Sequence, residues 1–410
     1  MVVAKMEARK RLLALAVLLC ELEDDDEYFY PVAKRSRQQE ESPPERILKD
    51  RLDADPGEYR KLLRVSREQF LHLLARVRAR IEKENAATGA RRPVNAETRL
   101  QVTLRYLTSG ESYEFLSRQF RVARTKCGDL IHKTCIVIFE ELKKDFMKAP
   151  KTNEDWKEVM RVFGDKCNFP NCLGAIGGKH VTIKKPARAS YMYLNHKKTF
   201  SVILLAAVDA NGKFIYIEAG APGGQDSGPL WQNAVLQKAI QEKRTRIPEL
   251  VEVASSPNVL LPPAFVTDSA LPLEKHVVKP FAGTSLTEDK GVFNYRLSKA
   301  WLVMETAFKQ LEDRFRCLRT VIQEQPGKAV AIVTAACALH NFLGNSVPCL
   351  PDASFDAASS PFFGLRTSCE DGSSDAVIAR DNLCAFFNGR GAVPWQQEFT
   401  RAILKYSREP

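Results

Sequence analysis

The sequence predicts an α/β protein in which a mixed sheet with flanking helices is preceded by an all-α domain. Three observations predict this class. Apolar and β-branched runs of strand length recur between residues 173 and 267, a long apolar helical stripe follows over 293–316, and apolar side chains recur at helical spacing over 58–148. A chain of 410 residues with 44% hydrophobic content is long enough for a large core and a smaller domain.

The first predicted strand lies within residues 173–186. Leu173–Ile176 is a short apolar burst, and His180–Ile183 alternates and is β-branched. Gly177 and Gly178 stand between them, and glycine inside a strand marks a bulge or a close backbone approach. We therefore expect a central strand kinked at these glycines, with a plain structural bulge as the alternative to a functional position.

The following elements alternate between strand and helix. A buried strand, an Asn-Gly turn and a second strand make a hairpin, after which a Gly-rich loop, a helix and a third strand follow. In order, their residues are 199–208, 209–213, 214–219, 220–228, 230–240 and 258–267. The last of these strands ends at Asp268.

A long final helix is predicted over residues 293–316. Glu305 lies beside its apolar stripe. The residues of the stripe are Leu297, Trp301, Met304, Phe308, Leu311 and Phe315.

This order of elements, with acids at strand ends and one on the last helix, is that of an RNase-H-like nuclease core. Such a core needs convergent carboxylates because Mg²⁺ is a hard cation held by oxygen ligands, and two ions can clamp the attacking and leaving oxygens of a phosphodiester. Carboxylates that are distant in sequence suit this arrangement. The pattern therefore points to chemistry on a phosphodiester.

Seven sequence words, taken in order, carry a resemblance to a known family. They are Phe169–Val181, Phe200–Asp209, Asp226–Gly228, Thr267–Leu273, Phe293–Ala300, Met304–Phe308 and Ala338–Asn341. On these words, residues from about 60 to 345 resemble the PIF/Harbinger transposase-derived nucleases, a DDE-type group that hydrolyses DNA with divalent metal. The resemblance implies a DDE nuclease-like domain that would use Mg²⁺ or Mn²⁺.

Carried over from the family, the catalytic and metal-ligating positions are Asp226, Asp268 and Glu305. The first position departs from the family, because Gly177 stands where its first aspartate is expected. A glycine has no side chain with which to hold a cation, and Asp226 or Asp209 would restore activity only in part. The helix around Glu305 departs too, with Trp301, Lys309 and Glu312 in place of the family's residues.

Residues 58–165 predict a helical domain that resembles a helix-turn-helix. A helix over 112–120, a turn at 121–124 and a helix over 125–141 with Thr125 as N-cap make the pattern. Arg121, Arg124 and Lys126 supply positive charge near the second helix, which suits contact with DNA phosphates. The alternative is a helical bundle with a solvated basic edge.

A second basic segment follows the first strand. Its cations include Lys184, Lys185, Lys197 and Lys198, and tyrosines 191 and 193 are interleaved with them. Rings among cations suit base stacking and backbone tracking. The alternative for this segment is a solvated loop. His180, on the first strand, could orient a ligand or a phosphate. The alternative is a histidine that is hydrogen-bonded in the core.

The net charge and the cysteine pattern limit the classes of protein that the sequence fits. A formal net charge of +11 favours a polyanionic partner. None of the ten cysteines forms a paired C-x-x-C set, so reduced thiols in an intracellular protein are expected rather than a zinc site.

The terminal regions predict segments outside these domains. Residues 12–20 form a short apolar run that we interpret as a packing helix rather than a signal peptide or a membrane span, and 34–37 form a weak basic cluster. The predicted domains are 1–57, an N-terminal helix and linker; 58–165, helical; 166–345, DDE nuclease-like; 346–380, a disordered linker; and 381–410, a C-terminal helical segment.

Two function classes follow. The first is a metal-dependent nuclease acting on DNA, impaired because Gly177 replaces the first aspartate. The alternative is a catalytically inactive domesticated transposase that binds DNA or chromatin. The resemblance further implies a nuclear protein, DNA as the partner, a separate Myb-like DNA-binding protein as a second partner, and no membrane.

Overall fold

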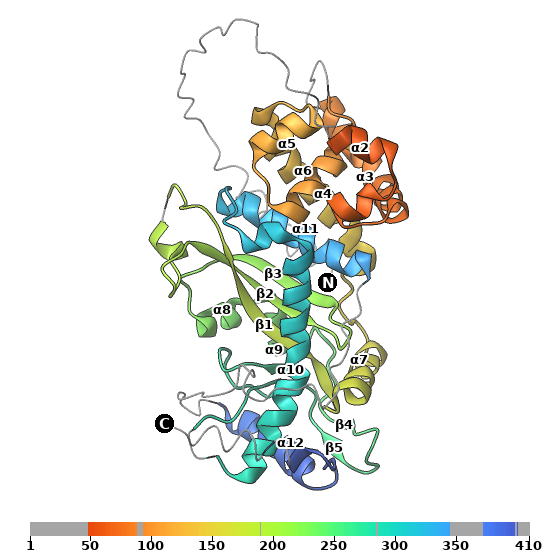
Figure 1. Ribbon diagram of the computed structural model, residues 1–410. Coiled ribbons are helices and arrows are strands. Elements are labelled where there is room, and N and C mark those ends of the chain that lie inside the picture. The colour runs from red at the N-terminus through yellow and green to blue at the C-terminus, as the bar shows by residue number, and fades with distance from the viewer. Residues whose placement is uncertain are drawn as a thin grey trace, which may run out of the picture.

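The computed structural model describes residues 48–87, 93–188, 190–283, 286–344, 372–397 and 400. The expected N-terminal helix over 12–20, the basic cluster over 34–37 and most of the linker expected over 346–380 lie outside this part of the chain. Within it, the fold is a mixed α/β arrangement with a five-stranded sheet and flanking helices (Figure 1).

The main sheet has the strand order β3-β2-β1-β6-β7. The β1–β2 and β2–β3 pairs are antiparallel, whereas β1–β6 and β6–β7 are parallel. A separate pair of short strands, β4 and β5, is antiparallel. The strands are β1 Cys172–Thr182, β2 Ser201–Val208, β3 Phe214–Pro222, β4 Val251–Glu252, β5 Leu260–Leu261, β6 Ala264–Thr267 and β7 Val277–Val278.

Helices occupy both faces of the sheet and its two ends. They are α2 Leu48–Ala54, α3 Arg67–Ala87, α4 Ala96–Ser109, α5 Tyr113–Phe120, α6 Arg124–Phe146, α7 Asn153–Cys167, α8 Ser227–Asn233, α9 Val235–Gln241, α10 Glu288–Arg314, α11 Pro326–Leu343 and α12 Ser374–Asn388, with a π-helix η1 over Tyr59–Leu63 and two 3-10 turns, η2 Ser190–Tyr193 and η3 Arg316–Arg319. α2–α6 gather at one end of the molecule, and α12 lies with β4 and β5 at the other (Figure 1).

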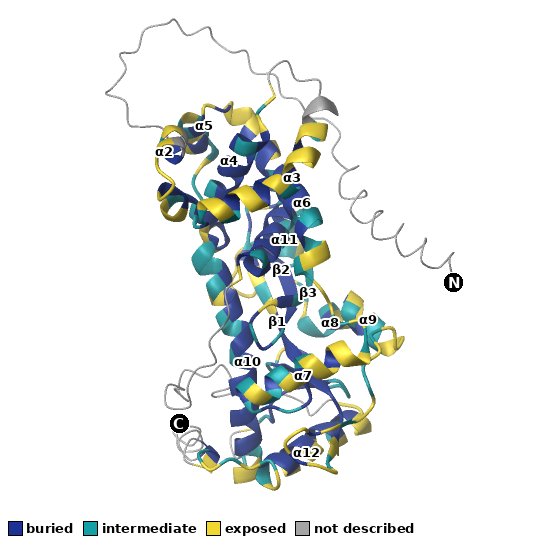
Figure 2. Ribbon diagram, turned by 90° about the vertical axis from the view of Figure 1, so that its right-hand side faces the viewer, coloured by how far each residue is buried: buried dark blue, intermediate teal, exposed yellow. Residues whose placement is uncertain are grey.

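The strand alternation sorts side chains into two apolar cores. On one face, Ala175 and Val181 of β1 belong to the core that contains Trp301 and Met304 of α10. On the other face, Leu173 and Ile176 pack in the core formed with α7–α9, which includes Trp156 and Met160. The central strand β2 is buried along its whole length, whereas α7 exposes its outer side, as Figure 2 shows.

The expected kink at Gly177 and Gly178 is wrong. β1 pairs with β2 without a register shift from Ala175 opposite Val208 to Thr182 opposite Ser201, and the irregularity lies earlier, between Cys172 and Gly174. Gly174 has a φ of 147°. The bulge therefore falls at the glycine whose positive φ other residues rarely adopt, and the two later glycines are regular strand residues.

Other expected boundaries shift by a few residues. The strand expected over 258–267 is split into β5 and β6 around Pro262 and Pro263, because proline has no N–H for a sheet ladder. α10 begins at Glu288, where Thr287 caps it by accepting from Lys290 N, and α12 begins at Ser374, within the segment expected to be linker.

Two helices stand where the helix-turn-helix pattern places them. α5 is capped by Ser112 and ends at Arg121, which has a left-handed backbone. Thr125 is not the N-cap of α6, because that helix begins at Arg124 after Ala123, and Lys126 N already donates to Ala123 O. Thr125 lies inside the first turn and is exposed.

α11 joins the helical end of the molecule to the sheet. Asn341 donates through Nδ2 to Phe146 O at the end of α6 and to Phe214 O at the start of β3, and its Oδ1 accepts from Phe214 N at 2.9 Å. The neighbouring His340 contacts Gly212 O through Nε2 at 3.1 Å. The sequence word that ends in Leu-His-Asn thus holds together three elements that are distant in sequence.

In the described residues, no helix combines the length and apolarity needed to cross a membrane.

Candidate functional site

Asp268 and Glu305 come together at the end of β6. Asp268 follows the strand directly, and its Oδ1 accepts from Ala270 N at 3.0 Å, which fixes the carboxylate in a turn. Burial raises the pKa of Asp268 above its ordinary value. Burial also raises the pKa of Glu305, and the charge of Asp268 raises it further, so the two carboxylates lie within electrostatic reach of one another.

Gly177 lies beside this pair. Ile176 pairs with Thr267 across the parallel β1–β6 ladder, which puts Gly177 level with Asp268. A Cβ added at Gly177 would meet Met304 Cγ at 3.1 Å, and Trp301 and Phe308 at 3.7 Å. The structure thus brings Gly177, Asp268 and Glu305 to one place, but three side chains of α10 close over Gly177.

Two polar contacts fasten α10 to β1 on either side of Gly177. Trp301 Nε1 donates to Ile176 O at 3.0 Å, and Lys179 Nζ pairs with Glu312 at 3.0 Å while lying over the Phe308 ring. The apolar stripe places Trp301, Met304 and Phe308 on the inner face of the helix. Nothing in the sequence shows which residue of β1 they meet, because that depends on how the helix crosses the sheet.

The residues present do not fit a two-metal centre. DDE-superfamily nucleases generally use divalent metals, and two partly buried carboxylates, of which Asp268 raises the pKa of Glu305, are a setting that a cation would stabilise. The third ligand is missing at Gly177, and across the described ranges no group of three or more His, Cys, Asp or Glu side chains could hold a metal ion. The described residues therefore give no basis for a metal-dependent hydrolytic step at this site.

Asp226 and Asp209 lie elsewhere on the sheet. Asp226 is exposed and is the N-cap of α8, after the edge strand β3, whereas Asp268 follows β6 on the other side of β1. Asp209 Oδ1 accepts from Asn211 N and Lys213 N, so it stabilises the β2–β3 turn. That Asp226 binds a metal ion remains a prediction. The hydrogen bonds within the β2–β3 turn explain the position of Asp209.

His180 faces away from α10. It alternates with Lys179 along β1, and its Nδ1 lies 3.0 Å from Ser201 Oγ, which also accepts from Asn195 Nδ2. Burial, followed by the charges of His196 and Lys197, lowers its pKa. His180 is thus hydrogen-bonded and belongs to the opposite face of the sheet from Gly177.

The cations expected to contact nucleic acid are mostly on the surface. Lys184 is half-buried, and the others are exposed: Arg121, Arg124, Lys126, Lys185, Lys197 and Lys198. Arg121 forms an ion pair with Asp50 at 3.6 Å. Tyr191, beside the second group, is 78% exposed, which leaves its ring open for stacking.

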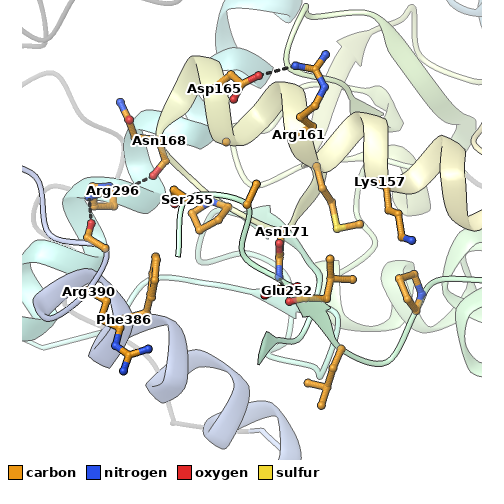
Figure 3. Close-up of a pocket in the computed structure, with 18 of the residues that line it drawn as sticks. Lys157, Arg161, Asp165, Asn168, Asn171, Glu252, Ser255, Arg296, Phe386 and Arg390 are labelled. Atoms are coloured by element: carbon orange, nitrogen blue, oxygen red, sulfur yellow. Dashed lines mark hydrogen bonds and ion pairs between the residues drawn. The ribbon is translucent and has the colours of Figure 1, made fainter. Parts of the chain in front are cut away.

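A cavity of about 760 Å³ lies away from these residues (Figure 3). α7, the segment 248–255 and the end of α12 line it, and its charged side chains are of both signs. Arg161 pairs there with Asp165, and Arg296 donates to Asn168 O. None of the acids predicted at the candidate site lines this cavity.

Comparison with known proteins identifies the class. Residues 176–341 match the family described as DDE superfamily endonuclease, and these residues span all five strands of the main sheet except the first four residues of β1. No solved structure matches the chain at a significant level. The residues that form the main sheet therefore match a DDE superfamily endonuclease domain.

Three curated relatives narrow the class further. Protein ALP1-like from Arabidopsis thaliana is 25% identical over 294 residues, 70% of this chain and 71% of the relative. Antagonist of like heterochromatin protein 1, also from Arabidopsis thaliana, is 25% identical over 62% of this chain and 63% of its own length. Putative nuclease HARBI1 from Xenopus laevis is 24% identical over 61% of this chain and 68% of its own length. Together, the family match and these relatives support the Harbinger transposase-derived nuclease family as the one that this chain resembles.

Proposed function

We propose that this chain is a DNA-binding protein derived from a metal-dependent DNA endonuclease, and that its phosphodiester hydrolysis is impaired. The observation that carries the proposal is Gly177, which lies level with Asp268 and under Met304, where a third carboxylate would be needed. Asp268 and Glu305 keep their positions, so the frame of the site is retained while one ligand is lost.

The strand order supports an RNase-H-like core. Three antiparallel strands, β1–β3, are extended by the parallel strands β6 and β7, and the acid-bearing helix α10 crosses the central strand. The first strand and the strand after the hairpin lie side by side, which is how such a core brings distant carboxylates together. Asp226 remains a proposed further ligand.

Binding to DNA is supported by charge and exposure. The net charge is +11, and the second helix of the α5–α6 pair begins with exposed Arg124 and Lys126. We propose that this pair is a helix-turn-helix and that Lys185, Lys197 and Lys198 hold further phosphates. A nuclear location follows from DNA as the substrate.

A second candidate is a protein that binds DNA or chromatin and has no cutting activity. Trp301, Met304 and Phe308 fill the space over Gly177 with apolar atoms, which favours this candidate. One relative is named an antagonist of a heterochromatin protein, which agrees with a chromatin-related function.

A plasmid-nicking assay with Mg²⁺ or Mn²⁺ tests both candidates. We expect the unmodified chain to nick weakly and Glu305→Ala to nick less, because the ligand set is incomplete. Nicking by the unmodified chain that is no faster than that of Glu305→Ala supports the second candidate. Gly177→Asp supplies the missing carboxylate. Metal-dependent nicking that rises above weak nicking by the unmodified chain supports the first candidate, whereas nicking by this variant alone supports the second.

Gly177→Ala is the matched control, because it adds the Cβ beside Met304 without a carboxylate. Thermal unfolding of both variants shows whether each one folds. If Gly177→Asp folds and nicks no faster than Gly177→Ala, the second candidate is supported. Strong nicking by the unmodified chain that Glu305→Ala abolishes overturns the proposed impairment.

A further inference from the structure

Four cations surround a hollow of about 690 Å³ between the helical end of the molecule and the end of α10. Its lining residues are Arg60, Lys61, Arg64, Val65, Ser66, Gln69, Arg314 and Leu343. No acidic side chain of the described residues is among them. We infer that this hollow is a phosphate-binding pocket.

Two arginines of the hollow, Arg64 and Arg314, lie in a strongly positive setting. The pKa of Arg64 is lowered by burial and then by the charges of Arg316, Arg319 and Arg105. Burial and the charge of Arg64 likewise lower the pKa of Arg314. Bringing guanidinium groups together in a partly buried place is unfavourable, and a bound anion with several acceptor oxygens relieves it.

Nearby acids are engaged with other cations. Lys61 pairs with Glu58 at 3.0 Å, and that carboxylate also pairs with Arg51. Asp313 pairs with Arg319. One carboxylate is thus shared by two cations, and the other serves an arginine that does not line the hollow.

Capping of α10 explains only part of the cluster. Arg64 Nη1 donates to Asp313 O at 3.0 Å, and cations near a helix C-terminus interact favourably with its dipole. This accounts for Arg64 and Arg314. It does not account for Arg60 and Lys61, which are exposed on η1.

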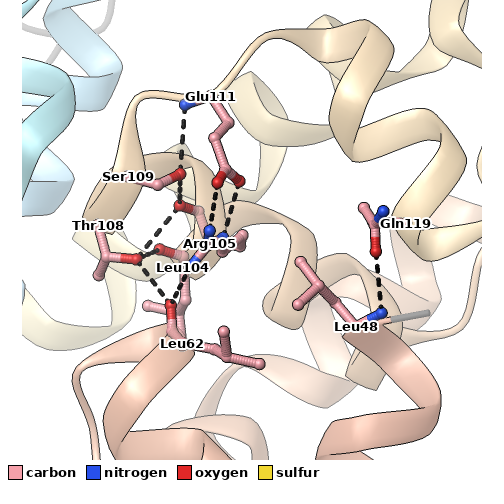
Figure 4. Close-up of polar contacts among 8 residues, drawn as sticks. All are labelled: Leu48, Leu62, Leu104, Arg105, Thr108, Ser109, Glu111 and Gln119. Atoms are coloured by element: carbon pink, nitrogen blue, oxygen red, sulfur yellow. Dashed lines mark hydrogen bonds and ion pairs between the residues drawn. The ribbon is translucent and has the colours of Figure 1, made fainter. Parts of the chain in front are cut away.

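Hydrogen bonds from α4 hold the backbone of η1, which carries Arg60 and Lys61. Leu62 O, in the middle of η1, accepts from Arg105 Nη1 and from Thr108 Oγ1, both at 3.2 Å, and Arg105 is itself held by Glu111 (Figure 4). The hollow also adjoins the start of α3, where Ser66 and Gln69 cap each other and the helix dipole is positive. The backbone that carries Arg60, Lys61 and Arg64 is therefore fixed beside the end of α10.

The ligand chemistry is a phosphate group, from either of two sources. Arginine forks match phosphate oxygens. Arg314 follows Glu305 by nine residues on α10, which is roughly 13 Å along the helix. A phosphodiester near the candidate site would therefore have a neighbouring backbone phosphate within reach of this pocket, and a free polyphosphate has the same chemistry.

Isothermal titration calorimetry with sodium tripolyphosphate tests the pocket on the full chain without divalent metal. We expect one saturable site per chain, and a loss of affinity of about tenfold in Arg60→Gln and in Lys61→Gln, because each removes one charge-assisted contact. Arg78→Gln removes an exposed arginine of α3 that does not line the hollow, and it should leave the affinity unchanged.

Duplex DNA then distinguishes the sources. If DNA displaces tripolyphosphate from the unmodified chain, the pocket holds a backbone phosphate; if it does not, the ligand is a free phosphate compound. Absence of a saturable site, or equal affinities in all four proteins, overturns the inference. The experiment measures binding only. Its result therefore does not depend on whether the protein cuts DNA.

Discussion

At the scale of single residues, Asp268 and Glu305 form a pair of carboxylates that favour protonation. A carboxyl group with a raised pKa binds its proton more tightly in the folded than in the unfolded chain. Its stabilising contribution is present below the unfolded pKa and is lost as the pH rises through the folded pKa. At neutral pH the charged pair is therefore a cost to folding.

Glu305→Gln should make the protein more stable at pH 7.5, because it removes one of the two charges. The gain should shrink toward pH 4, where the carboxyl groups take up protons. Thermal unfolding at a series of pH values, without divalent metal, measures it.

Glu158→Gln is the control for this prediction. Glu158 is an exposed glutamate whose pKa is lowered by its hydrogen bond to Arg161, so its removal should give no gain at pH 7.5. A loss of stability in Glu305→Gln at pH 7.5 would contradict the proposed repulsion.

At the scale of elements, α11 connects structures that the chain order keeps apart. Asn341 makes hydrogen bonds to both backbone groups of Phe214 and to Phe146 O, and the residue is buried. Buried backbone groups that lose their partners cost more than the bonds themselves contribute. Asn341 lies in one of the sequence words that resemble the family, and its role is structural. Other such words contain the acidic residues of the candidate site.

Asn341→Ala should lower the free energy of unfolding by about 3 kcal/mol or more, because it leaves several buried backbone groups unpaired. Chemical denaturation measures the change. Thr334→Ala on the same helix is the control, since Thr334 bonds only to carbonyls of its own helix within the described hydrogen bonds. A change below about 1 kcal/mol for Asn341→Ala would show that water replaces these bonds.

At the scale of the whole molecule, a net charge of +11 predicts DNA binding that depends on salt. The exposed cations of the α5–α6 region and of residues 184–198 are distributed over two parts of the fold, as the extended shape in Figure 1 allows. Several phosphates can then be contacted at once.

Lys185→Gln and Lys197→Gln should each reduce the slope of log affinity against log salt concentration by about 0.9, because each removes one phosphate contact. Fluorescence anisotropy with duplex DNA at several salt concentrations measures the slope. Lys238→Gln, an exposed lysine of α9, should leave it unchanged. Equal slopes in all four proteins would remove these residues from the DNA surface.

Periodicity and spacing predicted much of this protein without coordinates. The alternation of apolar residues placed the strands, the α10 stripe oriented that helix, and the ordered words indicated the family that the chain resembles. These features are local, since each depends on residues within a few turns or one strand. The same local signals placed the bulge at the wrong position, because Gly174, Gly177 and Gly178 look alike in sequence.

Contacts between distant segments required the folded chain. The register of β1 against β6 puts Gly177 level with Asp268, the crossing of α10 puts Met304 over it, and the meeting of η1 with the end of α10 gathers the cations of the phosphate pocket. Residues 60 and 314 are brought together by packing, and no spacing in the sequence records that. The physical reason is that side-chain direction follows local backbone geometry, whereas the neighbours a side chain meets follow from how whole elements pack.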